Sequence, residues 1–378
     1  MTVVSNDQIT KAPDGGWGWI VVMASFMQHA LIDGMTCTFG IFYDDILATF
    51  NEGSARTQVL SSIIVGVSFL IGPFTGVLIN RFDCRSVAMV GGAVGFMGTL
   101  LSTFSKNLNI MILLYGVVGG IGLGLVYSPS LVIVSYYLDK RRALATGIAT
   151  CGSGVGCLVF SPVNQVLIDT YRWKGALWIV SAILFNCTLF AVVYRPLKFT
   201  NRKNNPVEPI AMSSNANTSF DLKKTVDELK QSLKTITVPF FTDSAFLLFM
   251  TSSVLVAMGI QIPYNLLPTF ALAKGLSDSD GALLISILGM SNTVSMVLSG
   301  LVADYPWADS ILTYSVPLLI GGVASVFVSC YSDFITLAIY CIVIGVGIGT
   351  YGDLRLQTYE FILGYYNYAG VYYAGAPV

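Results

Sequence analysis

Long apolar runs separated by short polar breaks dominate the chain. Taking every Asp, Glu, Lys and Arg as a break leaves nine long runs, and the stretch from Gly15 to about Tyr43, interrupted only by His29 and Asp33, adds a tenth. A helix needs about 20 apolar residues to cross the hydrocarbon core of a bilayer. We therefore predict ten membrane-spanning helices, at 15–43, 57–80, 86–105, 107–138, 143–168, 175–194, 244–273, 281–303, 310–332 and 334–352.

The predicted spans form two groups with a polar segment between them. Within this segment, Asp221–Lys234 has an amphipathic pattern that favours a helix lying on the membrane surface over a regulatory partner site. The organisation we expect is a cytoplasmic N-terminus (1–14), a six-helix bundle (15–194), a cytoplasmic loop (195–243), a four-helix bundle (244–353) and a tail or partial helix (354–378).

Composition and charge indicate which class of protein this is. Hydrophobic residues make up 54% of the chain and charged residues 11%, against roughly 25% charged in soluble domains, which excludes a soluble enzyme. The net charge of −1 gives no basic surface for nucleic acid. The seven cysteines lack metal-ligand spacing, and we expect no metal and no cofactor. The expected fold class is an all-α polytopic membrane protein in a lipid bilayer.

Lysine and arginine set the orientation, because cytoplasmic loops carry an excess of both. With the N-terminus in the cytoplasm, the cytoplasmic segments hold 15 of the 20 basic residues and the outer loops hold five. The N-terminus is therefore predicted to be cytoplasmic.

Six spans, a long basic loop and a second set of spans match the layout of the major facilitator transporters. The loop after the second span, Gly76–Arg85, resembles the superfamily's G-x-L-x-D-R-x-G-R-R motif, with Asn80 in place of the usual acid and Arg81 kept. The matching place in the second group keeps Asp304 but has Tyr305 where the arginine is expected. Each half thus retains part of a charged motif that closes helix ends.

Two longer motifs narrow the resemblance. Residues 13–19 read P-D-G-G-W-G-W, and residues 136–156 read Y-Y-L-D-K-R-R-A-L-A-T-G-I-A-T-C-G-S-G-V-G. The chain resembles the monocarboxylate transporter family, whose signatures are D-G-G-W-G-W and Y-F-x-K-R-R-x-L-A-x-G-x-A-x-A-G-S-x-x-G. The motif residues are Asp14, Gly15, Gly16, Trp17, Trp19, Lys140, Arg141, Arg142 and Gly147.

Physical chemistry favours anchoring over substrate contact for both motifs. Trp17 and Trp19 suit the membrane interface, where an indole keeps its N–H in water, and Asp14 can cap the helix that follows. The basic run at 140–142 suits a negatively charged cytoplasmic leaflet. The glycines at 116–124 and 147–156 lie inside apolar spans, so they indicate close helix packing rather than a nucleotide-binding loop.

The resemblance implies a carrier of the plasma membrane, not an enzyme, that moves small organic solutes by alternating access. For some members it also implies an accessory single-span glycoprotein. The family has twelve helices and ten are predicted here, so the alternative is a transport-inactive chain without the last two helices that regulates or scaffolds a partner.

Ionisable groups at bilayer depth are costly and mark candidate functional sites. His29 and Asp33 are four residues apart and share a helix face, where they could bind a substrate amine, relay a proton, or pair with neighbouring helices. Arg355 could clamp a carboxylate or anchor the cytoplasmic end. Tyr264 and Asn265 lie between Pro263 and Pro268, which we expect to break the seventh span.

The resemblance also implies a departure from proton-coupled lactate carriers. Those carriers use a lysine in the first helix and an Asp–Arg pair in the eighth, and the matching positions here are Cys37, Asn292 and Met296. The carboxylate partner and the usual proton route are therefore missing. Proton coupling is put in doubt, and uniport of a different solute, such as a zwitterion, is favoured over lactate.

Overall fold

The computed structural model describes residues 15–138, 142–195, 244–303, 310–331 and 333–351, and all secondary structure in these ranges is helical. The all-α prediction is confirmed, and each of the ten predicted spans falls on helix. The elements are α1 (Trp17–Cys37), α2 (Phe39–Phe50), α3 (Ser54–Leu70), α4 (Gly72–Ser102), α5 (Leu108–Met111), the π-helix η1 (Ile112–Gly119), α6 (Gly120–Tyr137), α7 (Arg142–Thr150), α8 (Gly152–Val192), α10 (Ser244–Ala273), α11 (Asp278–Ala303), α12 (Ser310–Val326), the 3-10 helix η2 (Val328–Cys330) and a last helix, Phe334–Tyr351.

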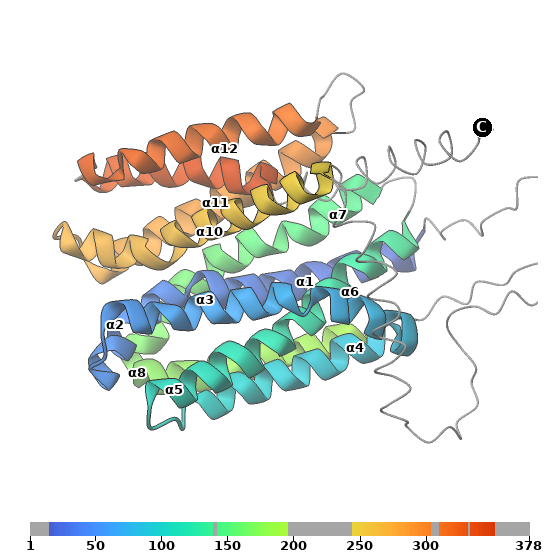
Figure 1. Cartoon of the computed structure of the whole chain (residues 1–378), viewed down its shortest axis with the longest axis horizontal. Coiled ribbons are helices and arrows are strands. Elements are labelled where there is room, and N and C mark those ends of the chain that lie inside the picture. Colours follow the sequence, from blue (N-terminus) through green and yellow to red (C-terminus); the bar gives the residue numbers. More distant parts are fainter. Residues whose placement is uncertain (1–14, 139–141, 196–243, 304–309, 332, 352–378) are drawn as a thin grey trace, which may run out of the picture.

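Six helical stretches in the described residues are long and apolar enough to cross a membrane. They lie along one direction, with the helices before residue 195 filling the lower part of Figure 1 and those after residue 243 the upper part. We call these the N-terminal half (15–195) and the C-terminal half (244–351). We call one end of the bundle the Asn51 end, where loops 51–53 and 274–277 lie, and the other the Trp17 end.

Two helices turn sharply where the sequence predicts separate spans. Asp83 inside α4 has φ 70° and ψ 152°, and Arg172 inside α8 has φ 59° and ψ 170°. This region of backbone space suits glycine and costs other residues about 1–3 kcal/mol. The charges that break the apolar pattern at 81–85 and 169–174 therefore coincide with two strained turns rather than with loops.

We expect Arg172→Gly to stabilise the protein by about 1 kcal/mol, because glycine adopts this conformation without strain. Thermal unfolding of the purified protein in detergent measures the change. Arg172→Ala is the matched control, since it removes the same charge and keeps the Cβ. An equal gain from both variants would attribute the effect to the lost charge instead.

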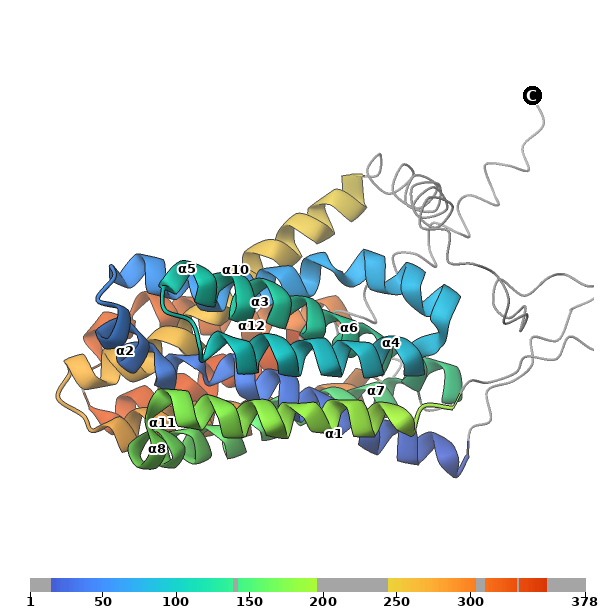
Figure 2. The same ribbon diagram turned by 90° about the horizontal axis from the view of Figure 1, so that it is seen from below.

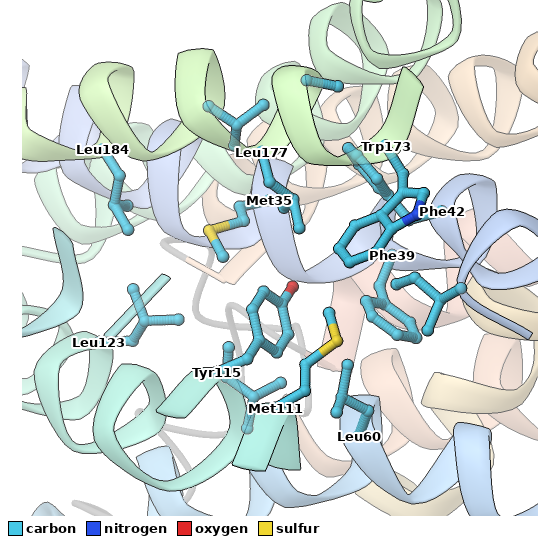
Figure 3. Close-up of a cluster of buried hydrophobic side chains, with 14 of the residues drawn as sticks. Met35, Phe39, Phe42, Leu60, Met111, Tyr115, Leu123, Trp173, Leu177 and Leu184 are labelled. Atoms are coloured by element: carbon cyan, nitrogen blue, oxygen red, sulfur yellow. The ribbon is translucent and has the colours of Figure 1, made fainter. Parts of the chain in front are cut away.

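The core of the N-terminal half lies toward the Asn51 end. Apolar side chains from α1, α2, α3, η1, α6 and α8 meet there in one buried cluster (Figure 3). The cluster includes Tyr115, which is 1% exposed, and Trp173, whose indole Nε1 donates to Thr49 Oγ1 at 2.8 Å. Satisfying the indole N–H allows this large ring to be buried without an unpaired donor.

Close helix packing at the glycines is confirmed. A Cβ on Gly122 of α6 would lie 2.9 Å from the backbone oxygen of Gly91 and closer still to the backbone of Gly95, both in α4. Gly120 faces the backbone oxygen of Ile64 in the same way, at 2.8 Å. Small residues let membrane helices approach until their backbones touch, which replaces the missing hydrophobic driving force.

The two family motifs meet at the Trp17 end. The Trp17 indole Nε1 donates to the backbone oxygen of Val193 at 3.3 Å, and the Arg195 guanidinium lies 3.7 Å from the centre of the Trp17 ring. Tyr137, from the second motif, donates its hydroxyl to the backbone oxygen of Arg195 at 2.8 Å. The expectation of a water-exposed indole N–H is therefore wrong for Trp17, which fastens the start of α1 to the end of α8.

Candidate functional site

Helix α8 joins the two halves through three glycines. Gly152 and Gly156 face the backbone of α1, whereas Gly154 faces α11, where a Cβ would lie 2.6 Å from the backbone oxygen of Gly289. Gly289 in turn faces the backbone of Gly154 at 2.8 Å. The sequence motif G-S-G-V-G thus places one helix in backbone contact with both halves.

Asp33 lies beside this crossing, at the middle of the 34-residue span Trp17–Phe50. Its side chain is partly exposed, and its carboxylate lies near the Ser153 hydroxyl of α8. The Cys157 thiol, one turn further along α8, contacts the backbone oxygen of Asp33 at 3.9 Å and lies near the thiol of Cys37. Helices α1 and α8 therefore present a carboxylate, a hydroxyl and two thiols to one region.

The C-terminal half completes this region with Tyr264 of α10 and Asn292 of α11. The Tyr264 hydroxyl accepts a hydrogen bond from Asn292 Nδ2 at 3.4 Å and lies within electrostatic range of Asp33 and Cys37. The other amide atom, Asn292 Oδ1, is buried without a hydrogen-bond partner. We call Asp33, Cys37, Ser153, Cys157, Tyr264 and Asn292 the central cluster.

The central cluster carries one formal charge. Asp33 forms no salt bridge within the described residues, where the ion pair found is Arg56–Glu52 at the Asn51 end, with N and O 2.9 Å apart. An unpaired carboxylate at this depth is expensive, so the site favours a bound cation or a proton.

A family model described as the Major Facilitator Superfamily matches residues 18–362. The chain belongs to the major facilitator superfamily. Its relatives include monocarboxylate transporter 3 of Gallus gallus, 29% identical over 371 residues that cover 94% of this chain and 68% of the relative. Monocarboxylate transporter 1 of Bos taurus is 28% identical over 370 residues, covering 93% of this chain and 74% of the relative.

Membership of the major facilitator superfamily makes this chain a multi-pass membrane protein of a transporter fold. Its relatives are named as transporters, not enzymes. Membership of this superfamily implies that the protein lies in a lipid bilayer and that its substrate is a small solute.

The superfamily fold brings together four of the predicted site residues, Asp33, Cys37, Tyr264 and Asn292. His29 is fully buried elsewhere: its Nδ1 contacts the backbone oxygen of Ser25 at 2.9 Å, and its ring packs edge-on against Tyr127 with centroids 4.8 Å apart. Sharing a helix face with Asp33 does not bring His29 into contact with its carboxylate.

The other predicted site residues that the structure describes lie outside the central cluster or beside it. Asn265 donates to Ser61 of α3 at 3.0 Å, and Met296 is buried one turn from Asn292. Arg81 is exposed at the turn of α4, 5.6 Å from the Phe82 ring centre. Helix α10 continues through Pro263 and Pro268, so the expected break is absent. The remaining positions, with the side chain of Arg142, lie outside the described residues: Asp14, Lys140, Arg141, Asp304 and Arg355.

Sequence reasoning missed Ser153 and Cys157. Both lie in a glycine-rich motif, which we interpreted as a site of close helix packing. The glycines of the motif do pack against α1 and α11. The signal that could have found them is their spacing, because residues four apart share a helix face, here the face that looks toward Asp33.

Contacts between the halves differ along the bundle. Several hydrogen bonds join the halves on the Asn51 side of the centre: Ser161 Oγ to Ala282 O (2.6 Å), Ser286 Oγ to Leu158 O (3.3 Å), Asn265 Nδ2 to Ser61 Oγ (3.0 Å) and Thr269 Oγ1 to Asp44 Oδ2 (3.4 Å). Toward the Trp17 end, α10 diverges from the bundle (Figure 2). The described hydrogen bonds between the halves thus lie on the Asn51 side, whereas at the Trp17 end the halves meet where α7 packs against α11.

Proposed function

We propose that this protein is a carrier that moves a small organic solute, a monocarboxylate or a zwitterion, by alternating access. The observation that carries the proposal is the position of the central cluster. It lies half-way along the helices, and both halves contribute to it: α1 and α8 from one, α10 and α11 from the other. In major facilitator transporters the substrate site lies near the bilayer midplane, where the halves meet.

The distribution of polar contacts between the halves supports alternating access. Hydrogen bonds join the halves on the Asn51 side of the centre, through Ser161, Asn265 and Thr269. With the N-terminus in the cytoplasm, as the distribution of Lys and Arg favours, the Asn51 end is the outer end. Hydrogen bonds of this kind are weak enough, at about 0.5–1.5 kcal/mol each, to exchange during transport.

The composition of the central cluster argues against proton coupling of the lactate-carrier type. Cys37, Asn292 and Met296 stand where the resemblance implies a lysine, an aspartate and an arginine. Asn292 bonds the hydroxyl of Tyr264, so its amide has an uncharged partner. The proposal is therefore uniport across the plasma membrane, driven by the solute's own gradient.

Uptake by the purified protein in liposomes tests the proposal. We expect saturable uptake of a small labelled carboxylate or zwitterion that is unchanged when a proton gradient is imposed. Acidification of the lumen in step with uptake would overturn the uniport assignment. Absence of any saturable uptake, with and without a co-expressed accessory glycoprotein, would favour the transport-inactive alternative.

A further inference from the structure

Three hydrogen-bond donors of the central cluster are already engaged. Cys157 contacts the backbone oxygen of Asp33, and Asn292 Nδ2 donates to Tyr264. Ser153 Oγ lies 2.9 Å from the backbone oxygen of Thr150 as well as within reach of the Asp33 carboxylate. A hydroxyl has one proton, so Ser153 cannot satisfy both acceptors at once.

Two groups of the central cluster have acceptor atoms that lack donors. Asn292 is 3% exposed and its Oδ1 has no partner. Asp33 is acceptor-only when ionised, offers about four lone-pair sites on two oxygens, and has the Ser153 hydroxyl nearby. A buried acceptor without a donor costs about 1–3 kcal/mol, and more when it is charged. A ligand with N–H groups and a positive charge would supply donors to both Asn292 Oδ1 and the Asp33 carboxylate, and so remove the cost of leaving each unpaired.

We propose that the central cluster recognises a cationic nitrogen, an ammonium or guanidinium group, on the transported solute. The inference rests on the proposed carrier function and specifies its substrate class. Asp33 pairs with the charge, and Asn292 Oδ1 accepts one of the N–H groups. A solute with a carboxylate and no such nitrogen would face the Asp33 carboxylate without a basic side chain among the described residues of the cluster.

Cys37 offers a direct probe of this chemistry, because it is partly exposed and one turn from Asp33. The other exposed cysteine among the seven is Cys330, so a Cys330→Ser background leaves Cys37 as the accessible thiol. Cys37→Ser in the same background identifies any labelling elsewhere. Purified protein in detergent is then treated with a cationic and an anionic methanethiosulfonate reagent of similar size.

We expect the cationic reagent to modify Cys37 faster than the anionic one, by about tenfold relative to their ratio at a small free thiol, because a nearby carboxylate attracts one and repels the other. Asp33→Asn should return the ratio to that reference while the protein stays folded and monodisperse. An unshifted or inverted ratio with Asp33 present would overturn the proposal.

Protection by solutes separates recognition from transport. Three solutes of similar size serve as probes: β-alanine, propylammonium and propionate. Slower labelling of Cys37 with the two amines and not with propionate supports the proposal, and protection by propionate alone or by none of the three overturns it. Uptake of propionate without recognition of the amines would leave the carrier function standing and this inference refuted. Protection by amines without uptake would refute the carrier function alone.

Discussion

Asp33→Asn is expected to lower saturable solute uptake about 100-fold. Removing the carboxylate takes away the one formal charge of the central cluster and leaves the shape of the side chain nearly unchanged. Losing one charged partner of a buried pair costs 2–5 kcal/mol, and 2.7 kcal/mol corresponds to about 100-fold. Initial uptake rates in liposomes, normalised to reconstituted protein, measure the loss. Asp33→Glu keeps the charge but moves it by a methylene, so it should retain part of the uptake.

Asp169→Asn is the matched control for that experiment. Asp169 is an exposed carboxylate of α8 near the Asn51 end, where it accepts a hydrogen bond from Gln165 at 3.0 Å. Its neutralisation should leave uptake unchanged. Unchanged uptake in Asp33→Asn, or an equal loss in both variants, would remove Asp33 from the substrate site.

Gly122→Leu is expected to destabilise the N-terminal half by about 3 kcal/mol or more, because overpacking a tight contact forces backbones apart. The contact between α6 and α4 leaves no space for even a Cβ at this position. The melting midpoint of the purified protein in detergent should fall, and much of the expressed protein should aggregate.

Gly66→Leu tests whether bulk alone causes such an effect. Gly66 is exposed on α3, and a Cβ there would meet nothing within 4 Å. This variant should fold at least as well as the native chain, since leucine is a better helix former than glycine. A fall in the midpoint as large as that for Gly122→Leu would contradict the packing explanation.

The existence of the helices could be predicted because the bilayer imposes a length on every apolar run. The residues at which the helices begin and end were harder to predict. Helix α3 begins at Ser54, three residues before the predicted span, because Arg56 is exposed in its first turn and pairs with Glu52 and Asn109. Charge marks where a helix leaves the lipid, which need not be the residue where the helix begins. At Asp83 and Arg172 the charged break and the change of backbone conformation do coincide, since both residues are non-helical and the chain turns there.

The candidate site was partly visible in the sequence. A charge in an apolar run singles out Asp33, and the resemblance singles out Cys37 and Asn292. His29 looked equally strong, but its ring packs on Tyr127 in another part of the N-terminal half. Which side of a buried helix looks toward the other half depends on the crossing of α8 with α1 and α11. That crossing is set by tertiary contacts between glycines far apart in the sequence.

The contact of Gly154 with Gly289 also bears on how easily the halves can move. Most helix pairs interlock their side chains, and sliding them requires rotamers to disengage. At this crossing the two backbones meet directly, flanked by the side chains of Thr293 and Cys157. Because few side chains lie between the helices there, little has to disengage when one helix turns over the other. We therefore expect the resistance to rocking to come mainly from the polar bonds at the Asn51 end.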